Sequence, residues 1–273
     1  MNQGSNNMEK RYSVSGAFLK HTAYLSMFVD HFFAVVFWAY WEWLLVNGAS
    51  AGAADAAGTV YRMGRAVGRL AFILFAFMAS EGFQHTRSRK KYLLRLLVFA
   101  VISEIPFDLA IKGKFFTMDG QNVYWTLFLG VAALCFLEKL RGRLLLQFLS
   151  IVLCCIAAFL LDTDYMFMGV CLIVVLYLCR KSFWYQFAAG SVTVYVGMVL
   201  IYAVNYWGSG IHWSLYLQAG TTELYGLLAF VLIYFYNGKK GMQFPKVFYY
   251  WFYPLHLLLL YGIKMCFFPS MTP

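Results

Sequence analysis

The feature that most constrains the fold of this chain is its first long apolar run, Ala17 to Trp43, which is long enough to cross a bilayer as a helix. Ionisable side chains interrupt the run, among them Lys20, Asp30 and His31. An ionisable residue inside such a run is energetically costly, and by default it marks a functional site or a buried ionic partner. The run therefore predicts a transmembrane helix that carries polar chemistry within the membrane.

Lys20 and His31 are expected to lie on one face of this helix. Eleven residues amount to a net rotation of about 20° and a rise of about 16 Å, which places Lys20 near one end and His31 near the middle of the membrane. A cation at the rim and a titratable ring below it can hold a charged, elongated reagent and deprotonate a group at its tip. In the alternative interpretation, Lys20 snorkels to the interface and His31 is bonded by a neighbouring helix. Asp30 points about 100° away from His31, so it is expected to bond another helix or fix local structure more than to pair with His31.

The composition indicates an all-α polytopic membrane protein. Of the 273 residues, 62% are hydrophobic and 12% are charged, whereas a soluble domain carries about 25% charged residues. The first apolar run is longer than the apolar core of a signal peptide, which has about 7–15 residues, so we expect a retained helix. The apolar runs predict one helical-bundle domain, residues 1–273, with nine spans near 17–43, 66–84, 92–111, 122–138, 144–161, 165–179, 183–206, 212–236 and 246–268.

The charged residues in the connections between these spans predict the orientation of the chain. The net charge is +10, but basic residues confined to short loops orient a membrane protein and do not indicate binding to nucleic acid. By the positive-inside rule, we expect a cytoplasmic amino terminus and an external carboxyl terminus. The basic connections contain residues 87–91, 139–143, 180–181 and 239–246, and the intervening ones contain mainly Arg62, Arg65, Lys112, Lys114, Asp162 and Asp164, with no charge between Trp207 and Ile211.

In this orientation the polar side chains form a row from the cytoplasmic rim to the outer face. His31 and His256 are expected at similar depth, on the first and last spans. Glu81 and His85, four residues apart, share a helix face and can pair. Such a row suits an enzyme that takes a donor from the cytoplasm and an acceptor from outside, or a transporter with a proton relay of histidines and carboxylates. The other members are Lys20, Lys91 and Arg95 at the cytoplasmic rim and Arg69, Glu104 and Asn122 toward the outside, while His212 is expected near the outer surface without a role in the site.

Six sequence motifs together resemble one family. They are the run from Leu19 ending in M-x-x-D-H at His31, GRLAFILFAFMASEGFQHT from Gly68, KYLLRLL from Lys91, SEIPFD from Ser103, QNVYWTLFLG from Gln121 and FYPLHLLLLY from Phe252. With these motifs the chain resembles the TraX family, named for the inner-membrane protein that acetylates the amino terminus of conjugative pilin. It is also similar to the wider membrane acyltransferases, including acyltransferase family three, whose first span carries a basic residue, ten residues and then His. Lys20 and His31 fit that spacing, with Lys where Arg is common, and Lys91 and Arg95 match the family's cytoplasmic Arg pair loosely.

The resemblance implies transfer of an acetyl group from cytoplasmic acetyl-CoA to an amine or hydroxyl at the outer face of the bacterial cell membrane. The family's acceptor is pilin, and another protein, a glycan or a lipid would use the same donor chemistry. No metal is expected, because the six cysteines show no metal-ligand spacing. The expected roles are general base catalysis by His31, with Asp30 and His256 as further catalytic residues, binding of the CoA phosphates by Lys20, His85, Lys91 and Arg95, and acceptor binding by Arg69, Glu81, Glu104 and Asn122.

Overall fold

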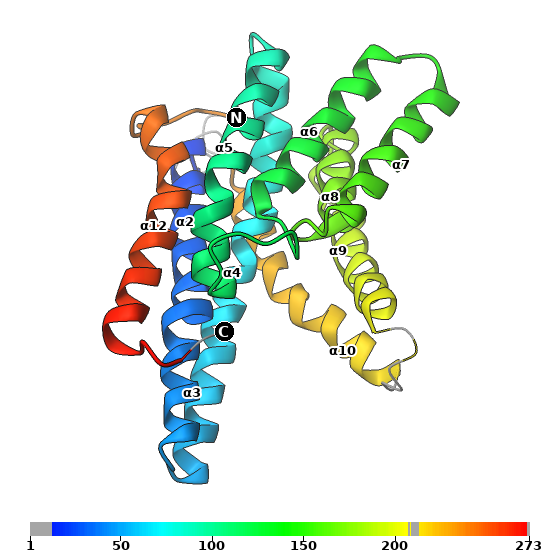
Figure 1. Cartoon of the computed structure of the whole chain (residues 1–273). Coiled ribbons are helices and arrows are strands. Elements are labelled where there is room, and N and C mark those ends of the chain that lie inside the picture. The colour runs from blue at the N-terminus through cyan, green and yellow to red at the C-terminus, as the bar shows by residue number, and fades with distance from the viewer. Residues whose placement is uncertain (1–12, 207, 209–212, 272–273) are drawn as a thin grey trace, which may run out of the picture.

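The computed structural model describes residues 13–206, 208 and 213–271 of the chain (Figure 1). Over these residues the fold is all-α and contains nine helical stretches, as the apolar runs predict. Most of the predicted uncharged connection at 207–211, and His212, lie outside this described part. The stretches are α2–η1–α3 (Gly16–Phe32, Phe33–Phe37, Trp38–Val46), α4 (Ala51–His85), α5–η2 (Arg89–Phe107, Asp108–Lys112), α6 (Val123–Lys139), α7 (Leu144–Leu160), α8 (Met166–Leu178), α9 (Phe183–Asn205), α10–η3–α11 (Trp213–Glu223, Leu224–Leu228, Ala229–Tyr234) and α12 (Lys246–Phe267).

Two long helices form the first hairpin of the fold. The first, α2–η1–α3, continues for 31 residues and begins where the Ser15 hydroxyl accepts a hydrogen bond from the Phe18 amide, 3.3 Å away. The second, α4, has 35 residues, and Ser50 caps it in the same way by accepting from the Ala53 amide at 3.3 Å. At about 1.5 Å per residue both helices exceed the ~30 Å hydrocarbon core of a bilayer, so the hairpin extends beyond it.

The predicted boundaries of these two helices are wrong. The apolar pattern predicts a first span that ends at residue 43 and a second that begins at residue 66, with Arg62 and Arg65 in the connection, but both arginines lie on α4. Residues 51–65 are rich in alanine, which has the highest helix propensity, although they are too polar to register as part of an apolar run. The indole of Trp41 closes the hairpin by donating to the Ala54 carbonyl oxygen at 3.0 Å.

Several helices are long and apolar, which identifies a multi-pass membrane protein. Within the described part of the chain, three helices are long and apolar enough to cross a membrane: Gly16–Val46, Ala51–His85 and Phe183–Asn205. Shorter apolar helices cover residues 144–160, 166–178 and 224–234.

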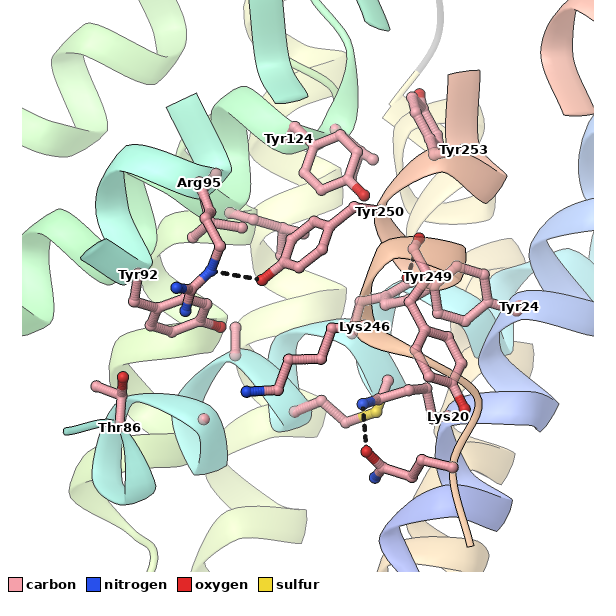
Figure 2. Close-up of a pocket in the computed structure, with 18 of the residues that line it drawn as sticks. Lys20, Tyr24, Thr86, Tyr92, Arg95, Tyr124, Lys246, Tyr249, Tyr250 and Tyr253 are labelled. Carbon is pink, nitrogen blue, oxygen red and sulfur yellow. Dashed lines mark hydrogen bonds between the residues drawn. The ribbon is translucent and has the colours of Figure 1, made fainter. Parts of the chain in front are cut away.

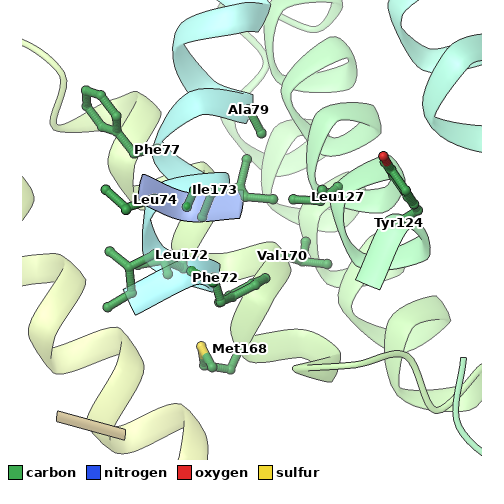
Figure 3. Close-up of a cluster of buried hydrophobic side chains, with 14 of the residues drawn as sticks. Phe72, Leu74, Phe77, Ala79, Tyr124, Leu127, Met168, Val170, Leu172 and Ile173 are labelled. Atoms are coloured by element: carbon green, nitrogen blue, oxygen red, sulfur yellow. The ribbon is translucent and has the colours of Figure 1, made fainter. Parts of the chain in front are cut away.

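The apolar core lies where α4, α6 and α8 meet at the centre of the bundle (Figure 1). Figure 3 shows Phe72 and Leu74 of α4 close to Leu172 and Ile173 of α8. On one side of this core, α2 packs along α4, and α12 packs against α2 and α5. The polar face of α2 is therefore enclosed between α4 and α12, away from lipid.

Candidate functional site

A cavity of about 440 Å³ opens between α2, α4, α5, α6 and α12, at the end of the bundle where α2 and α12 begin (Figure 2). Its mouth is basic and its walls are aromatic. Figure 2 shows Lys20 and Lys246 on one side and Tyr253 at the far, deep end. The tyrosines that line it are Tyr24, Tyr92, Tyr124, Tyr249, Tyr250 and Tyr253.

Two cations at the cavity mouth have neutral hydrogen-bond partners. Lys20 Nζ donates to Gln243 Oε1 at 3.3 Å and lies 4.5 Å from the centre of the Tyr249 ring. Arg95 Nε donates to the Tyr250 hydroxyl at 3.2 Å. Because no carboxylate neutralises them in the described residues, their charges are available to an anionic ligand.

Lys240 and Lys246 add two more cations to the mouth, and neither is among the site residues predicted from the sequence. The Lys246 ammonium has no hydrogen bond or ion pair within the described ranges, and it projects into the cavity in Figure 2. One signal was present in the sequence. Lys246 precedes His256 by ten residues on the last span, much as Lys20 precedes His31 by eleven on the first.

The predicted donor-binding residues do not all reach the cavity. Lys20, His85 and Arg95 line it, whereas Lys91 is exposed on the first turn of α5 and does not. His85 lies at the rim with 74% of its side chain exposed, and its Nε2 is 3.4 Å from Glu81 Oε2, the contact that their four-residue spacing predicts. Glu81 itself is not part of the lining.

Two histidines from the first and last helices are in contact just behind the deep wall of the cavity. His31 Nδ1 lies 2.7 Å from His256 Nε2, and the two rings stack with centroids 4.9 Å apart. His256 Nδ1 lies 2.8 Å from the carbonyl oxygen of Phe252. Both histidines are buried, and the ring of Tyr253, which lines the cavity, contacts both of them.

These contacts fix the tautomers of the neutral histidine pair. A carbonyl oxygen can only accept, so His256 carries its proton on Nδ1 and its Nε2 is an acceptor. His31 must then donate from Nδ1, which leaves its Nε2 unprotonated. No hydrogen bond in the described part of the chain engages that nitrogen. His31 Nε2 is therefore a free base held in place through the other nitrogen of its ring.

Asp30 bonds another helix and does not bond His31. Its Oδ2 lies 2.8 Å from Arg65 Nη1 on α4, and its Oδ1 lies 3.9 Å from Arg69 Nη2. The helices approach this closely because residue 68 is glycine: a Cβ on Gly68 would lie 2.0 Å from Asp30 Oδ1. Asp30 thus joins α2 to α4 immediately beside His31. The sequence predicts an interhelical partner for Asp30 but does not identify Arg65 as that partner.

A second groove, of about 260 Å³, lies where α5 and α7 end and α6 and α8 begin, and it includes Arg69, near the middle of α4, in its lining. Arg69 Nη1 is 3.0 Å from Glu223 Oε1 and 3.4 Å from the Tyr165 hydroxyl, which also lines the groove. On its other side, Arg69 faces Asp30, the chain neighbour of His31. One residue of the groove lining therefore lies close to the chain neighbour of His31.

Glu104 and Asn122, which the sequence analysis associated with acceptor binding, are bonded to each other. Asn122 Nδ2 donates to Glu104 Oε2 at 2.6 Å, and the Trp125 indole donates to the same oxygen at 2.8 Å. Asn122 also caps α6, because its Oδ1 accepts from the Tyr124 amide at 3.0 Å. These bonds join α5 to α6 and hold Tyr124 in the cavity wall, whereas neither Glu104 nor Asn122 lines the cavity or the groove.

Comparison with known protein families shows which family the chain belongs to. The family model described as TraX protein matches residues 15–264, which include the cavity, the histidine pair and the groove. The chain belongs to the TraX family. This TraX-family chain is also 32% identical over 216 residues to the probable fimbrial assembly protein FimC, serogroup H1, of Dichelobacter nodosus, covering 75% of this chain and 84% of the relative. No solved structure matches the chain. The TraX match reaches from α2 into α12, so both helices that build the histidine pair belong to the family region.

Proposed function

We propose that this TraX-family chain is a membrane acetyltransferase that moves the acetyl group of acetyl-CoA to an amine or hydroxyl acceptor, with His31 as the general base. The observation that carries the proposal is that a basic, aromatic cavity ends at Tyr253, whose ring contacts the buried His31, and that no hydrogen bond among the described residues engages Nε2 of this histidine. The family is named for a protein that acetylates pilin, and the relative is a probable fimbrial assembly protein, so a pilin-like protein is the acceptor class that this relationship favours.

The cavity suits acetyl-CoA, the donor substrate, in both charge and length. Lys20, Arg95 and Lys246 at the mouth can hold its phosphates by charge-assisted hydrogen bonds. The rise from Lys20 to His31 is about 16 Å, comparable to an extended pantetheine arm, and tyrosine rings line the path between them. With the nucleotide at the open mouth, the thioester would lie beside Tyr253 and the histidine pair.

The histidine pair supplies the acid–base chemistry of the transfer. His31 Nε2 takes the proton of the acceptor while the acceptor's nitrogen or oxygen attacks the thioester carbon. His256 keeps the hydrogen bond from His31 Nδ1, which orients the ring and stabilises the imidazolium that forms. The sulfur leaves with the electron pair of the broken C–S bond and takes the proton from His31, so the products are free CoA and the acetylated acceptor. Asp30, through its bond to Arg65, holds α2 in register for this step.

In this proposal the donor enters from the cytoplasm and the acceptor from the opposite side. The connections at the cavity end of the bundle carry most of the basic residues, which the positive-inside rule assigns to the cytoplasm. The helices of the bundle then cross the bacterial cytoplasmic membrane as nine spans, with the amino terminus inside and the carboxyl terminus outside. The groove at Arg69 lies toward the outer end, where it can admit the acceptor.

A proton-coupled transporter is the second candidate. The Asp30–Arg65 and Arg69–Glu223 pairs adjoin the histidines, and buried groups of these kinds form proton relays in transporters. If the protein is a transferase, acetyl-CoA should raise the unfolding temperature of the detergent-solubilised protein, since a ligand that binds only the folded state stabilises it. Labelled acetyl-CoA should also yield a labelled acceptor or free acetate. The absence of both, with uptake of a solute into proteoliposomes driven by a pH gradient, would establish the transporter.

A further inference from the structure

Tyr253 lies where the basic cavity meets the histidine pair. It lines the cavity and is only 2% exposed, and its ring centroid is 5.8 Å from that of His31 and 5.7 Å from that of His256. Figure 2 shows its hydroxyl directed away from Lys20 and Lys246, toward the deep end. A ligand that reaches His31 from the cavity mouth must therefore pass beside this phenol.

The hydroxyl of Tyr253 is buried and has no hydrogen-bond partner among the described residues. No described group therefore accepts the phenol proton. Nearly all buried donors in folded proteins are paired, because an unpaired one is destabilising. An unpaired donor beside a cavity is thus a position for an acceptor atom of a ligand.

Other tyrosine hydroxyls of the cavity are already engaged. Tyr24 donates to the Tyr249 carbonyl oxygen at 2.7 Å, and the Tyr250 hydroxyl accepts from Arg95 at 3.2 Å. The Tyr124 hydroxyl points toward Tyr250 in Figure 2. Among these phenols, Tyr253 is the one whose ring contacts the proposed base.

We propose that Tyr253 is a catalytic residue whose hydroxyl donates a hydrogen bond to the carbonyl oxygen of the acyl thioester. The inference rests on the proposed function and adds the group that stabilises negative charge. When the acceptor's lone pair forms a bond to the carbonyl carbon, the C=O π electrons move onto oxygen, and Tyr253 stabilises that oxygen while keeping its own proton. When the C=O bond forms again, the C–S bond breaks, and the sulfur leaves with the electron pair and receives the proton that His31 took from the acceptor.

The test is Tyr253→Phe in the full-length protein, assayed by hydrolysis of acetyl-CoA, in which water replaces the unidentified acceptor. Loss of one oxyanion donor lowers kcat by about 10²–10³-fold, and the KM for acetyl-CoA should change far less because the phosphate contacts remain. Since the hydroxyl has no partner among the described residues, the unfolding temperature should stay the same or rise. If the hydroxyl had only a structural role, its removal would lower the unfolding temperature. Tyr261→Phe is the matched control, because it is the same change farther along α12 and outside the cavity lining. It should alter neither kcat nor the unfolding temperature.

A second readout observes the hydrogen bond itself. With acetyl-CoA carrying ¹³C at the thioester carbonyl, the infrared C=O stretch of the bound donor should lie below that of the free donor, and in Tyr253→Phe it should return toward the free value. Wild-type kcat with an unchanged stretch in Tyr253→Phe would overturn the inference, and so would a loss confined to Tyr124→Phe. Either result leaves the proposed function standing if the wild-type protein cleaves acetyl-CoA. If the wild-type protein neither binds nor cleaves it, the proposed function and the role of Tyr253 are both wrong.

Discussion

His31 Nδ1 and His256 Nε2 lie 2.7 Å apart, although 225 positions separate the two residues in the chain. The contact joins α2 to α12, and His256 in turn donates from Nδ1 to the Phe252 carbonyl oxygen at 2.8 Å. The result is a chain of two hydrogen bonds that ends at the unprotonated Nε2 of His31. A neutral histidine thus orients the proposed base, in the place that a carboxylate takes in many catalytic triads.

Replacement of His256 tests this orienting role. In His256→Ala the Nδ1 proton of His31 loses its acceptor, so the ring can rotate or change tautomer, and kcat for acetyl-CoA cleavage should fall by about 10–100-fold, as when residues that orient a metal-bound histidine are removed. The KM should not change. His256→Gln keeps an oxygen that can accept the bond and should recover part of the activity. Steady-state kinetics of the two variants test this prediction. Equal losses of kcat in both variants, or a change in KM alone, would argue against an orienting role of His256.

Lys246 and Lys91 distinguish the cavity in the structure from the site expected from sequence. Lys246→Gln removes a cation from the mouth and should raise the KM for acetyl-CoA about tenfold or more, because a hydrogen bond to a charged group contributes roughly 1.5–3 kcal/mol. The kcat should change little, since the phosphates are remote from the thioester. Lys91→Gln, on the exposed surface of α5, should leave both parameters unchanged. A larger KM effect at Lys91 than at Lys246 would place the phosphates on that surface.

Gly68 should not tolerate a side chain, because α4 touches Asp30 at that position. In Gly68→Ala the new Cβ would lie 2.0 Å from Asp30 Oδ1, so α2 must shift and the pair with Arg65 must move. Overpacking of this kind costs about 1–3 kcal/mol, and displacement of the adjacent His31 should lower activity. Gly52→Ala on the same helix, with no atom within 4 Å of its Cβ position, is the control and should be neutral or stabilising. If thermal unfolding shows that both variants are equally stable, the close contact at Asp30 is wrong.

The orientation of the bundle can be measured with engineered cysteines. In a background without the six native cysteines, Ser50→Cys in the α3–α4 turn should react with an impermeant maleimide added outside spheroplasts. Lys181→Cys in the α8–α9 turn should react only after the membrane is opened, because positively charged connections remain in the cytoplasm. Labelling of Lys181→Cys alone would invert the proposed topology, and labelling of both in sealed spheroplasts would exclude the nine-span arrangement.

The apolar runs were sufficient to predict the helices that lie within the membrane, because such helices must satisfy their own backbone hydrogen bonds and present apolar side chains. They failed between residues 51 and 65, where the helix is set by alanine propensity and by the Ser50 cap, and these residues are too polar to give a hydropathy signal. The 3₁₀ turn Leu224–Leu228, which interrupts the eighth stretch, also has no signature in the apolar pattern.

Helical geometry was enough to place Lys20 and His31 on one face and to give His256 a similar depth. The contact between the two histidines depends on how the first helix packs against the last, and no local pattern encodes that. For the same reason the sequence did not select Arg65 as the partner of Asp30, because the choice depends on the register between α2 and α4.

The most direct test of the proposed mechanism is the comparison of His31→Gln with the wild-type protein, using acetyl-CoA labelled in the acetyl group and, in parallel, calorimetric binding of CoA. Loss of general-base assistance should lower the rate of acetyl release or transfer by about 10²–10⁴-fold. The Kd for CoA should not change, because Lys20, Arg95 and Lys246 remain at the cavity mouth. Near wild-type turnover in His31→Gln, with normal CoA binding, would contradict the account, because the reaction would then proceed without the base on which it depends.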